Sequence, residues 1–388
     1  MLEPGGWGGI SQSSQYLVAA YRDLGHDALF ISATDYEVAA QLPRSARWPL
    51  VRWSRSRGVL RQTRLYRLLN VGNYFGALVR MWVRSRREPV DVLHLQGYYV
   101  PVLFWLTTLV MRPRVGTVVL SCHNAFLRKE GPRGGRLALF GVRRLLRTVD
   151  LAIVHSGGDV ENLTDERLGK PRAVRVLPLG WHPVAVHERS AARQSEQVPG
   201  ESFVALFLGY LRADKGLDLV AAALPRVPQE QQRALHLVVA GQDRGGLAPF
   251  LTMIREQPSE CHVRVVNGYL TNDEMSRLLA AADVVLLPYR MVSDSGILRM
   301  AMAAARPVIA ADVGGLAHVV RAANNGWLFG PDDAGALASA LGKAIGEPLD
   351  SRLARGRAGY EYALHHYAWS AVARAHADAI ALAGLRNP

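Results

Sequence analysis

Two short apolar runs flank a helix-forming stretch in the second half of the chain, and this arrangement restricts the fold more than any other part of the sequence. The first run, Val284–Leu287, and the second, Val308–Ala311, have the length and composition of buried strands. Between them, Ser293, Asp294 and Ser295 lie where a helix cap is needed, Gly296 would open the helix, and Arg306-Pro307 would end it. The segment therefore predicts a strand, a helix and a second strand, as in parallel α/β folds.

A unit of this kind creates a place for a phosphate group. The first helical amides have no partner inside the helix, and the helix dipole adds positive charge at the same end. Anions bind at such helix starts beside the carboxyl edge of a parallel sheet. We therefore interpret Ser295 and Gly296 as part of a site for a nucleotide diphosphate.

The order of motifs here resembles the donor-binding segment of the retaining glycosyltransferases of the GT-B fold, family 4 (group 1). In that family, a strand ending in Pro-Tyr precedes a Ser-Gly turn, a helix, a strand that opens with Pro-Val and a Gly-Gly turn. The corresponding residues are Pro288-Tyr289, Ser295-Gly296, Pro307-Val308 and Gly314-Gly315. The resemblance implies an α/β protein with two facing Rossmann-like domains and a cleft between them.

Apolar strand-like runs alternate with helical patterns in both halves of the chain, which predicts two parallel βαβ domains. The expected strands are residues 28–31, 92–95, 116–122, 151–154, 174–177, 203–208, 235–240, 263–266, 284–287 and 308–311. A polar stretch at residues 182–202 is interpreted as the linker. We expect an acceptor-side domain over residues 1–185, a donor-binding domain over residues 200–365, and a last helix within residues 366–388 that packs back on the first domain.

Composition agrees with a two-domain enzyme of the cytosol. The chain has 388 residues, of which 49% are hydrophobic, so two cores can be buried. Its only cysteines, Cys122 and Cys261, fall in different expected domains, and no signal peptide is recognised, which argues for a reducing compartment and against disulfides or zinc. The longest apolar run, residues 98–111, is too short to span a membrane.

The net charge of +13 predicts an acidic partner. Twelve arginines and no carboxylate lie between Arg44 and Arg87, interleaved with Trp48, Trp53, Tyr66, Tyr74, Phe75 and Trp82. This mixture is typical of the headgroup level of an anionic membrane, so we expect peripheral association with the inner face of the plasma membrane. The alternative is a solvated basic face. No nucleic-acid-binding motif is present, so we expect no nucleic-acid partner.

A glycine-rich loop, Gly5-Gly6-Trp7-Gly8-Gly9, precedes the first expected helix, residues 10–24. Glycines let backbone amides approach a ligand closely. The family resemblance implies that Gly8 and Gly9 face the donor diphosphate. Because the family's first strand precedes this loop and few residues are left for it, that strand is expected to be short.

Two histidines follow strands of the first half. His123 comes after residues 116–122, at the edge where ligands bind in α/β folds, and it is the strongest candidate catalytic residue there. The resemblance implies that His123 contacts the transferred sugar and helps to stabilise positive charge at its anomeric carbon. A structural histidine is the alternative. His155 resembles a second family position.

In the second half, Arg212 and Lys215 lie three residues apart after the strand at 203–208. Both cations can converge on a diphosphate whose negative charge grows as the sugar–phosphate bond breaks. The resemblance places a phosphate-binding lysine at Lys215, but Tyr210 stands where the family has its arginine, so Arg212 must substitute. The alternative is surface charge neutralised by Asp214.

The family's paired glutamates are absent. Val292 and Met300 occupy their positions, and His318 replaces a third acidic residue. Asp294 is close enough to replace the first glutamate as a catalytic residue, although it could instead be a helix cap. The resemblance implies that Tyr269, Leu270 and Met300 line the donor nucleoside.

The sequence contains no Asp-x-Asp motif, so a metal-bridged diphosphate is not expected and neither is any cofactor. Charge on the leaving group would instead meet Arg212, Lys215 and the amides of Ser295 and Gly296. The resemblance implies retention of anomeric configuration, with the acceptor attacking on the departing face and no enzymic base. Domain closure would exclude water from the donor.

The acceptor is expected to bind in the first domain. The segment at residues 98–106 is interpreted either as part of a site for a lipid-linked or saccharide acceptor in polysaccharide or glycolipid assembly, or as a buried core helix. Two other function classes stay open. One is a non-catalytic relative that acts as a scaffold, which the lost acidic residues favour, and the other is a different sugar-nucleotide enzyme such as an epimerase.

Overall fold

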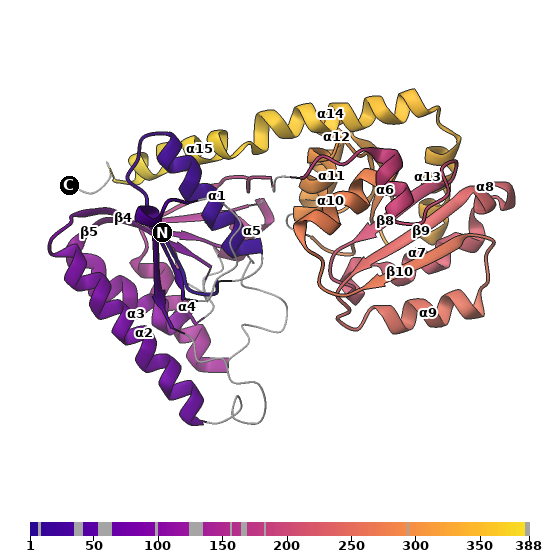
Figure 1. Ribbon diagram of the computed structural model, residues 1–388. Helices are drawn as coiled ribbons and strands as arrows, with labels where there is room; N and C mark the ends of the chain where they lie inside the picture. Colours follow the sequence, from indigo (N-terminus) through magenta and orange to yellow (C-terminus); the bar gives the residue numbers. More distant parts are fainter. Residues whose placement is uncertain are drawn as a thin grey trace. The chain divides into compact units, whose positions relative to one another are not determined.

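Two separate parallel-sheet units make up the chain in the computed structural model, shown in Figure 1. The structure describes residues 1–6, 9–34, 42–52, 64–97, 100–123, 135–155, 157–163, 169–181, 184–292 and 295–384. The N-terminal unit comprises Met1–Gly180 and Ala368–Pro388, and the C-terminal unit comprises Trp181–Tyr367.

Seven parallel strands form the sheet of the N-terminal unit, in the order β3-β2-β1-β4-β5-β6-β7. They are β1 Leu2–Glu3, β2 Phe30–Ala33, β3 Arg47–Val51, β4 Val90–Gln96, β5 Val115–Ser121, β6 Leu151–Val154 and β7 Ala173–Val176. Since all strands run the same way, their carboxyl ends meet at one edge of the sheet. The short first strand expected ahead of the glycine loop is β1.

Helices cover both faces of this sheet (Figure 1). They are α1 Gly9–Asp23, α2 Arg64–Ser85, α3 Pro101–Met111, α4 Gly135–Thr148, α5 Gly157–Leu163 and α15 Trp369–Gly384. The main core lies between the sheet and α2, α3 and α4, and it includes Phe104 and Leu145. The opposite face is covered by α1 and α15, where Ile153 of β6 packs with Ala379. The last helix of the chain therefore belongs to the N-terminal unit.

The C-terminal unit repeats this design with six parallel strands in the order β10-β9-β8-β11-β12-β13. The strands are β8 Phe203–Leu208, β9 Leu235–Gly241, β10 His262–Asn267, β11 Val284–Leu287, β12 Val308–Ala311 and β13 Gly326–Phe329. In β8, Phe207 faces one core cluster and Leu206 the other. Burial on both faces explains why these strands are continuous apolar runs rather than alternating ones.

Nine helices of the described C-terminal unit complete its two layers. They are α6 Arg189–Ser195, α7 Leu217–Ala223, α8 Gln229–Ala234, α9 Leu247–Glu256, α10 Asn272–Ala281, α11 Gly296–Ala303, α12 Gly314–Ala323, α13 Ala334–Gly346 and α14 Leu349–Tyr367. One core cluster joins the sheet to α7, α9 and α13, and the other joins it to α10, α11, α12 and α14.

The prediction that residues 182–202 form a linker is wrong for most of this segment. Residues 184–202 belong to the C-terminal unit, and residues 189–195 form α6. Glu188 caps this helix by accepting hydrogen bonds from the amides of Ser190 and Ala191. Arg193 is buried and donates to Asp283 over 2.6 Å. The segment was predicted to be a linker because it is rich in charged residues. Composition alone does not show whether a charge lies on the surface or is buried in an ion pair.

The basic N-terminal segment exposes fewer aromatic rings than the sequence predicted. Tyr74 is buried, with its hydroxyl 2.8 Å from that of Thr107, and Trp48 and Trp82 pack against the core. Phe75 is exposed. Trp53 and the side chain of Tyr66 lie outside the described residues.

The apolar run at residues 98–111 forms a helix of the core over residues 101–111. Its residues 101–111 are α3, in which Leu103 and Phe104 are buried. Tyr98 and Tyr99 lie outside the described residues. Of the two interpretations of this run, the core helix is confirmed for the part that the structure describes. In that part of the chain, no helix combines the length and apolar character that a membrane crossing requires.

Candidate functional site

A group of polar residues gathers at the carboxyl edge of the N-terminal sheet. His94 and Gln96 lie on β4, Ser121 ends β5, and His123 and His155 follow β5 and β6. Side chains alternate between the two faces of a strand, so residues two apart share a face. This face is the one covered by α1 and α15, and the expected site residue His123 lies there with four polar neighbours.

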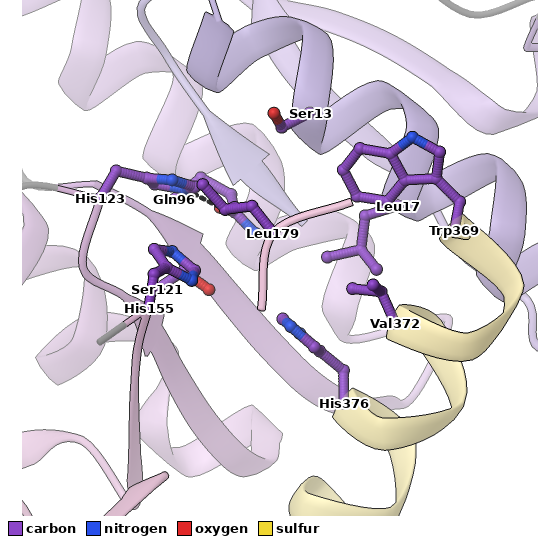
Figure 2. Close-up of a pocket in the computed structure, with 10 residues that line it drawn as sticks. All are labelled: Ser13, Leu17, Gln96, Ser121, His123, His155, Leu179, Trp369, Val372 and His376. Carbon is purple, nitrogen blue, oxygen red and sulfur yellow. Dashed lines mark hydrogen bonds between the residues drawn. The ribbon is translucent and has the colours of Figure 1, made fainter. Parts of the chain in front are cut away.

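Hydrogen bonds join His123, Gln96, His94 and Ser121 into a chain, and Figure 2 shows its members His123, Gln96 and Ser121. The Nε2 atom of His123 is 2.6 Å from Oε1 of Gln96, and Nε2 of Gln96 is 3.2 Å from Nε2 of His94. His94 Nε2 is also 2.8 Å from the hydroxyl of Ser121. The ring of His155 lies 4.9 Å from that of His123, and its Nδ1 is 2.9 Å from the carbonyl of Leu177. His123 is thus held within a network and has a partner in Gln96.

The polar residues line one side of a pocket, and residues from α1 and α15 line the other side. Ser13 and Leu17 extend from α1, and Trp369, Val372 and His376 from α15, as Figure 2 shows. The Trp369 ring stacks on Tyr16 of α1 at 5.7 Å. The last helix therefore builds one wall of the pocket that contains His123 and His155.

The deep part of the pocket is kept uncharged. Burial lowers the pKa of His94 well below its ordinary value, and the neighbouring His376 lowers it further. Burial also lowers the pKa of His376 to about 3. The His376 ring nitrogens have no hydrogen-bond partner among the described residues. Both deep histidines are therefore neutral near pH 7.

Two backbone amides of the glycine loop are already hydrogen-bonded to a side chain of the protein. The carboxylate of Glu3 accepts hydrogen bonds of 2.9 Å from the amides of Gly5 and Gly6. These two amides are therefore not available to a ligand. Gly9 is the first residue of α1, where helical amides point out of the helix. Gly8 lies outside the described residues.

In the C-terminal unit, the expected phosphate-binding segments lie side by side. The segment with Lys215 follows β8, and α11 follows β11, the strand that pairs with β8. Gly216 has a φ of +70°, and a Cβ atom there would lie 2.0 Å from the carbonyl oxygen of Pro288. Only glycine allows this approach, so Gly216 determines how closely the two segments pack.

Three predicted motif residues meet at this place, and we call them the Lys215 cluster: Lys215, Tyr289 and Ser295. The Lys215 ammonium lies 3.6 Å from the centre of the Tyr289 ring. The Tyr289 hydroxyl shares a hydrogen bond with Ser295, while burial raises the pKa of Tyr289 to about 12. Ser295 caps α11 by accepting a hydrogen bond of 3.2 Å from the amide of Leu298.

Lys215 is a partly desolvated cation. Burial lowers the pKa of Lys215 to about 8, although Asp214 acts in the opposite direction. At pH 7 the ammonium is still mostly protonated. A cation that has lost hydration, held over an aromatic ring beside the positive end of a helix, favours an anionic ligand.

Arg212 does not point freely to the same place. Its guanidinium forms an ion pair of 2.7 Å with Asp214, the arrangement left open as the alternative for this segment. In this unit sequence reasoning missed Arg290, which donates to Asp218 over 2.9 and 2.8 Å and to Asp332 over 2.7 Å. Arg290 thereby joins the Lys215 segment to the end of β11, and its place directly after Pro288-Tyr289 was the available signal.

The expected nucleoside-binding residues are not equally accessible. Tyr269 and Leu270 lie in the loop after β10, and Tyr269 is 56% exposed. Met300 is 4% exposed and lies within a core cluster, which Val292 joins from its edge. The side chain of Met300 thus packs in the core, and its place beside the donor nucleoside stays a prediction. Asp294 lies outside the described residues.

Gln96 and His94 were missed in the N-terminal unit. The predicted strand at residues 92–95 contained His94 and ended directly before Gln96, and two polar residues at alternate positions in an apolar strand are a usable signal. His376 gave no signal, because a histidine in an alanine-rich helix is usually exposed.

Comparison with known proteins identifies relatives of both units. A family model described as Glycosyl transferase 4-like domain matches residues 8–180, and one described as Glycosyl transferases group 1 matches residues 202–347. A D-inositol 3-phosphate glycosyltransferase from Xylanimonas cellulosilytica is 34% identical over 206 residues. That match covers 52% of this chain and 47% of the relative, so the alignment spans about half of the relative's length.

Solved structures share the fold over nearly the whole chain. Sucrose-phosphate synthase from Thermosynechococcus elongatus has a TM-score of 0.72 and 19% identity, covering 97% of this chain and 96% of its own. HepE from Anabaena, in complex with UDP, has a TM-score of 0.71 and 17% identity, covering 98% of both chains. At these identities the likeness shows the fold, which is that of two Rossmann-like units.

Proposed function

The chain belongs to the group 1 glycosyltransferases of the GT-B fold, and we propose that it transfers a sugar, with retention, from a nucleotide-diphosphate sugar to a lipid-linked or saccharide acceptor. The reaction would serve polysaccharide or glycolipid biosynthesis. The observation that carries the proposal is the Lys215 cluster, where a partly buried ammonium and the start of α11 lie together.

This cluster suits the leaving group of such a reaction. Negative charge on the nucleoside diphosphate grows as the bond to the sugar breaks, and fixed donors aimed at that charge lower the barrier. Lys215 and the first amides of α11 supply such donors, and Arg290 holds their segments together. HepE, which shares the fold, binds UDP, and this likeness supports a nucleotide donor.

The remaining steps involve residues outside the Lys215 cluster. His123 would contact the transferred sugar, and the proton of the acceptor hydroxyl would pass to the leaving phosphate, so that no enzymic base and no metal ion are needed. Gly8, Gly9 and Asp294 belong to the proposal as expected contacts. Arg212 joins it only if a ligand displaces Asp214 from the ion pair of 2.7 Å.

A surface of the N-terminal unit supports an acceptor held at a membrane. We call it the α2–α4 surface. Its exposed apolar residues are Phe75, Val79 and Val83 of α2 and Leu137 and Phe140 of α4. Seven arginines accompany them, Arg80, Arg86, Arg87, Arg136, Arg143, Arg144 and Arg147, and neither helix contains a carboxylate.

The two parts of this surface belong to one body. Tyr74 of α2 and Phe140 of α4 both contact α3, through Thr107 and Trp105. Exposed apolar side chains beside arginines are suited to the headgroup region of an anionic membrane. We therefore place the protein at the inner face of the plasma membrane, as a peripheral protein, with a lipid-linked acceptor as the favoured class.

Release of nucleoside diphosphate tests the transferase directly. Purified protein is incubated with UDP-, GDP- and ADP-sugars, with and without a bacterial lipid extract. One donor class should release its nucleoside diphosphate faster with the extract, and Lys215→Ala should abolish the gain while the exposed Lys343→Ala in α13 should not. Equal release by Lys215→Ala and the native protein would overturn the assignment of the donor site.

The membrane assignment has its own test. Val79→Glu with Leu137→Glu should reduce co-sedimentation with vesicles containing phosphatidylglycerol several-fold, because both side chains are exposed on the α2–α4 surface. The control is Val186→Glu, which changes a 99% exposed valine of the C-terminal unit. Vesicle binding that is equally strong in the double variant, or absent in the native protein, contradicts the membrane assignment.

One observation favours a second candidate. At the positions of the family's paired glutamates, Met300 is enclosed in a core cluster and Val292 packs against it, so neither offers a group to the donor ribose. A non-catalytic relative that binds in an assembly pathway would keep its fold without them. Nucleotide binding without any release of diphosphate would favour that candidate over the transferase.

A further inference from the structure

Gln96 lies between two imidazole rings at the end of β4. Its Oε1 atom is 2.6 Å from Nε2 of His123, and its Nε2 atom is 3.2 Å from Nε2 of His94 and 3.4 Å from Sδ of Met1. Gln96 is 1% exposed, so its amide is shielded from bulk solvent. The amide is thus fixed in position and in direction.

The orientation of the Gln96 amide determines which ring nitrogen of His123, Nδ1 or Nε2, carries the hydrogen. A carboxamide oxygen only accepts hydrogen bonds, so the Nε2 atom that faces it must be the protonated nitrogen. A neutral imidazole carries one hydrogen, and its other nitrogen then acts as an acceptor. In a neutral ring held this way, Nδ1 is the nitrogen of His123 that can accept.

His94, which lies behind Gln96 on the same strand, contacts the amide nitrogen of Gln96. His94 is buried and neutral, and its Nε2 atom can accept from the amide nitrogen of Gln96. The hydroxyl of Ser121, 2.8 Å away, shares the same atom of His94. Since β4 is paired on both sides, by β1 and β5, the backbone that carries His94 and Gln96 is rigid.

We propose that Gln96 is a positioning residue, which fixes the ring orientation and the Nε2–H form of His123 so that His123 accepts a hydrogen bond from the transferred sugar. This inference rests on the proposed glycosyl transfer. A neutral acceptor beside the anomeric carbon is compatible with positive charge developing there, whereas an imidazolium would oppose it. His94 and Ser121 act one step further back, by holding Gln96.

The hydrogen position can be read without any activity. Full-length protein with 15N-labelled histidine would show, in long-range 1H–15N spectra, the form of each neutral ring. His123 is expected as the Nε2–H form, assigned by loss of its signals in His123→Ala. Observation of His123 as the Nδ1–H form would overturn the inference.

Two substitutions then test the effect on catalysis. Gln96→Met keeps the size of the side chain but offers no acceptor, so His123 should populate both forms and kcat should fall about 10- to 100-fold, with KM for the donor changed less than about threefold. Gln96→Glu places a negative charge against the ring, which favours the imidazolium and should move the acid limb of the kcat profile to higher pH.

A matched control separates positioning from general loss of packing. Gln232 is a buried glutamine of the C-terminal unit whose amide donates to the carbonyl of Val227 over 2.6 Å. Gln232→Met should leave kcat and the His123 spectrum unchanged. A Gln96→Met variant with native kcat and native His123 spectrum would refute the inference. If the native protein transfers no sugar, the proposed function fails, and the spectrum alone decides whether Gln96 sets the form of His123.

Discussion

Two glycines of the C-terminal unit, Gly216 and Gly245, adopt left-handed backbone conformations in different surroundings. Gly216 has a φ of +70° and no room for a side chain, because a Cβ atom would lie 2.0 Å from the carbonyl oxygen of Pro288. Gly245 has a φ of +92°, and a Cβ atom there would meet nothing within 4 Å. Comparing the two positions therefore separates the energetic cost of backbone strain from that of steric overlap.

We predict that Gly216→Ala destabilises the C-terminal unit by more than about 2 kcal/mol, since strain and overlap add. Gly245→Ala should cost only about 1 kcal/mol, from strain alone. Urea unfolding of both variants measures the difference. Equal losses of stability would show that the approach of Gly216 to Pro288 is not tight.

The lowered pKa of Lys215 predicts how donor affinity depends on pH. A diphosphate favours the charged ammonium, and burial lowers the pKa of Lys215 to about 8 in the free protein. Below pH 8 the charge is present before binding. Above pH 8 the protein must take up a proton to bind, so affinity should fall by up to about tenfold per pH unit.

Calorimetric titration with the preferred nucleoside diphosphate at pH 7, 8 and 9 measures this effect. In Lys215→Arg the guanidinium stays charged, so the decrease above pH 8 should disappear. Affinity that does not change with pH in the native protein would exclude Lys215 as a ligand of the diphosphate.

Individual site residues were predictable only where a motif marked them. Lys215 and Ser295 stand at helix starts after apolar strands, and the structure brings both to Tyr289. Gln96 is different, because its role depends on His94 and His123, which come from the same and from a neighbouring strand. Sequence spacing does not show which way an amide turns, and that direction is what gives Gln96 its role.

At the scale of elements, both sheets use an aspartate in the same place. Asp150 precedes β6 and accepts from the amide of Val118 over 2.8 Å, and Asp283 precedes β11 and accepts from the amide of Val204 over 2.8 Å. Each carboxylate also binds arginines, among them Arg193 at 2.6 Å from Asp283. These ion pairs join a neighbouring strand to segments distant in sequence.

We predict that Asp283→Ala lowers the stability of the C-terminal unit by about 3–5 kcal/mol, because it leaves buried arginine charge without a partner. The control is Glu260→Ala, which removes an exposed ion pair with Arg233 and should have no measurable effect. Chemical unfolding distinguishes them. An Asp283→Ala variant as stable as Glu260→Ala would show that the buried arginines find other partners.

The bounds of strands were predicted most accurately where both faces of the strand are buried. The strands at Leu151–Val154, Phe203–Leu208, Val284–Leu287 and Val308–Ala311 agree with the expected bounds residue for residue, because each is apolar on both faces. β3 was missed because its sequence, Arg47–Val51, includes an arginine and a proline. The long helix α2 was missed because its exposed face carries arginines and valines together, which obscures the helical period.

At the scale of the whole molecule, the chain leaves the N-terminal unit after Gly180 and returns at Ala368. The returning helix α15 brings His376 into the buried polar face of the N-terminal sheet. Because this histidine stays neutral in the folded unit, the free energy of unfolding depends on pH. The pKa of His376 is lowered by burial to about 3, below its ordinary value of 6.5.

The sign of the pH effect follows from these values. Below pH 6.5 the unfolded chain takes up a proton that the folded unit does not accept until about pH 3, so stability falls as the pH decreases through this interval. One such histidine contributes about 1.4 kcal/mol per pH unit. His94, whose pKa is also lowered, adds to the slope.

We predict that His376→Leu reduces the loss of stability between pH 6.5 and pH 5, because leucine has no proton to take up. The control is His318→Leu, which changes an exposed histidine of α12. Unfolding midpoints measured across this pH interval test the prediction. A slope in His376→Leu equal to that of the native protein would contradict the assigned role of His376.

Thermal unfolding in the presence of UDP, GDP or ADP shows whether the Lys215 cluster binds the diphosphate of a nucleotide donor. One nucleotide at a hundredfold excess over its Kd should stabilise the protein by about 2.7 kcal/mol. Lys215→Ala should weaken that binding about tenfold or more, through loss of a charge-assisted contact, while Lys343→Ala should bind as the native protein does. Stabilisation by none of the three nucleotides, or an equal effect in Lys215→Ala, would show that the Lys215 cluster is not the donor site.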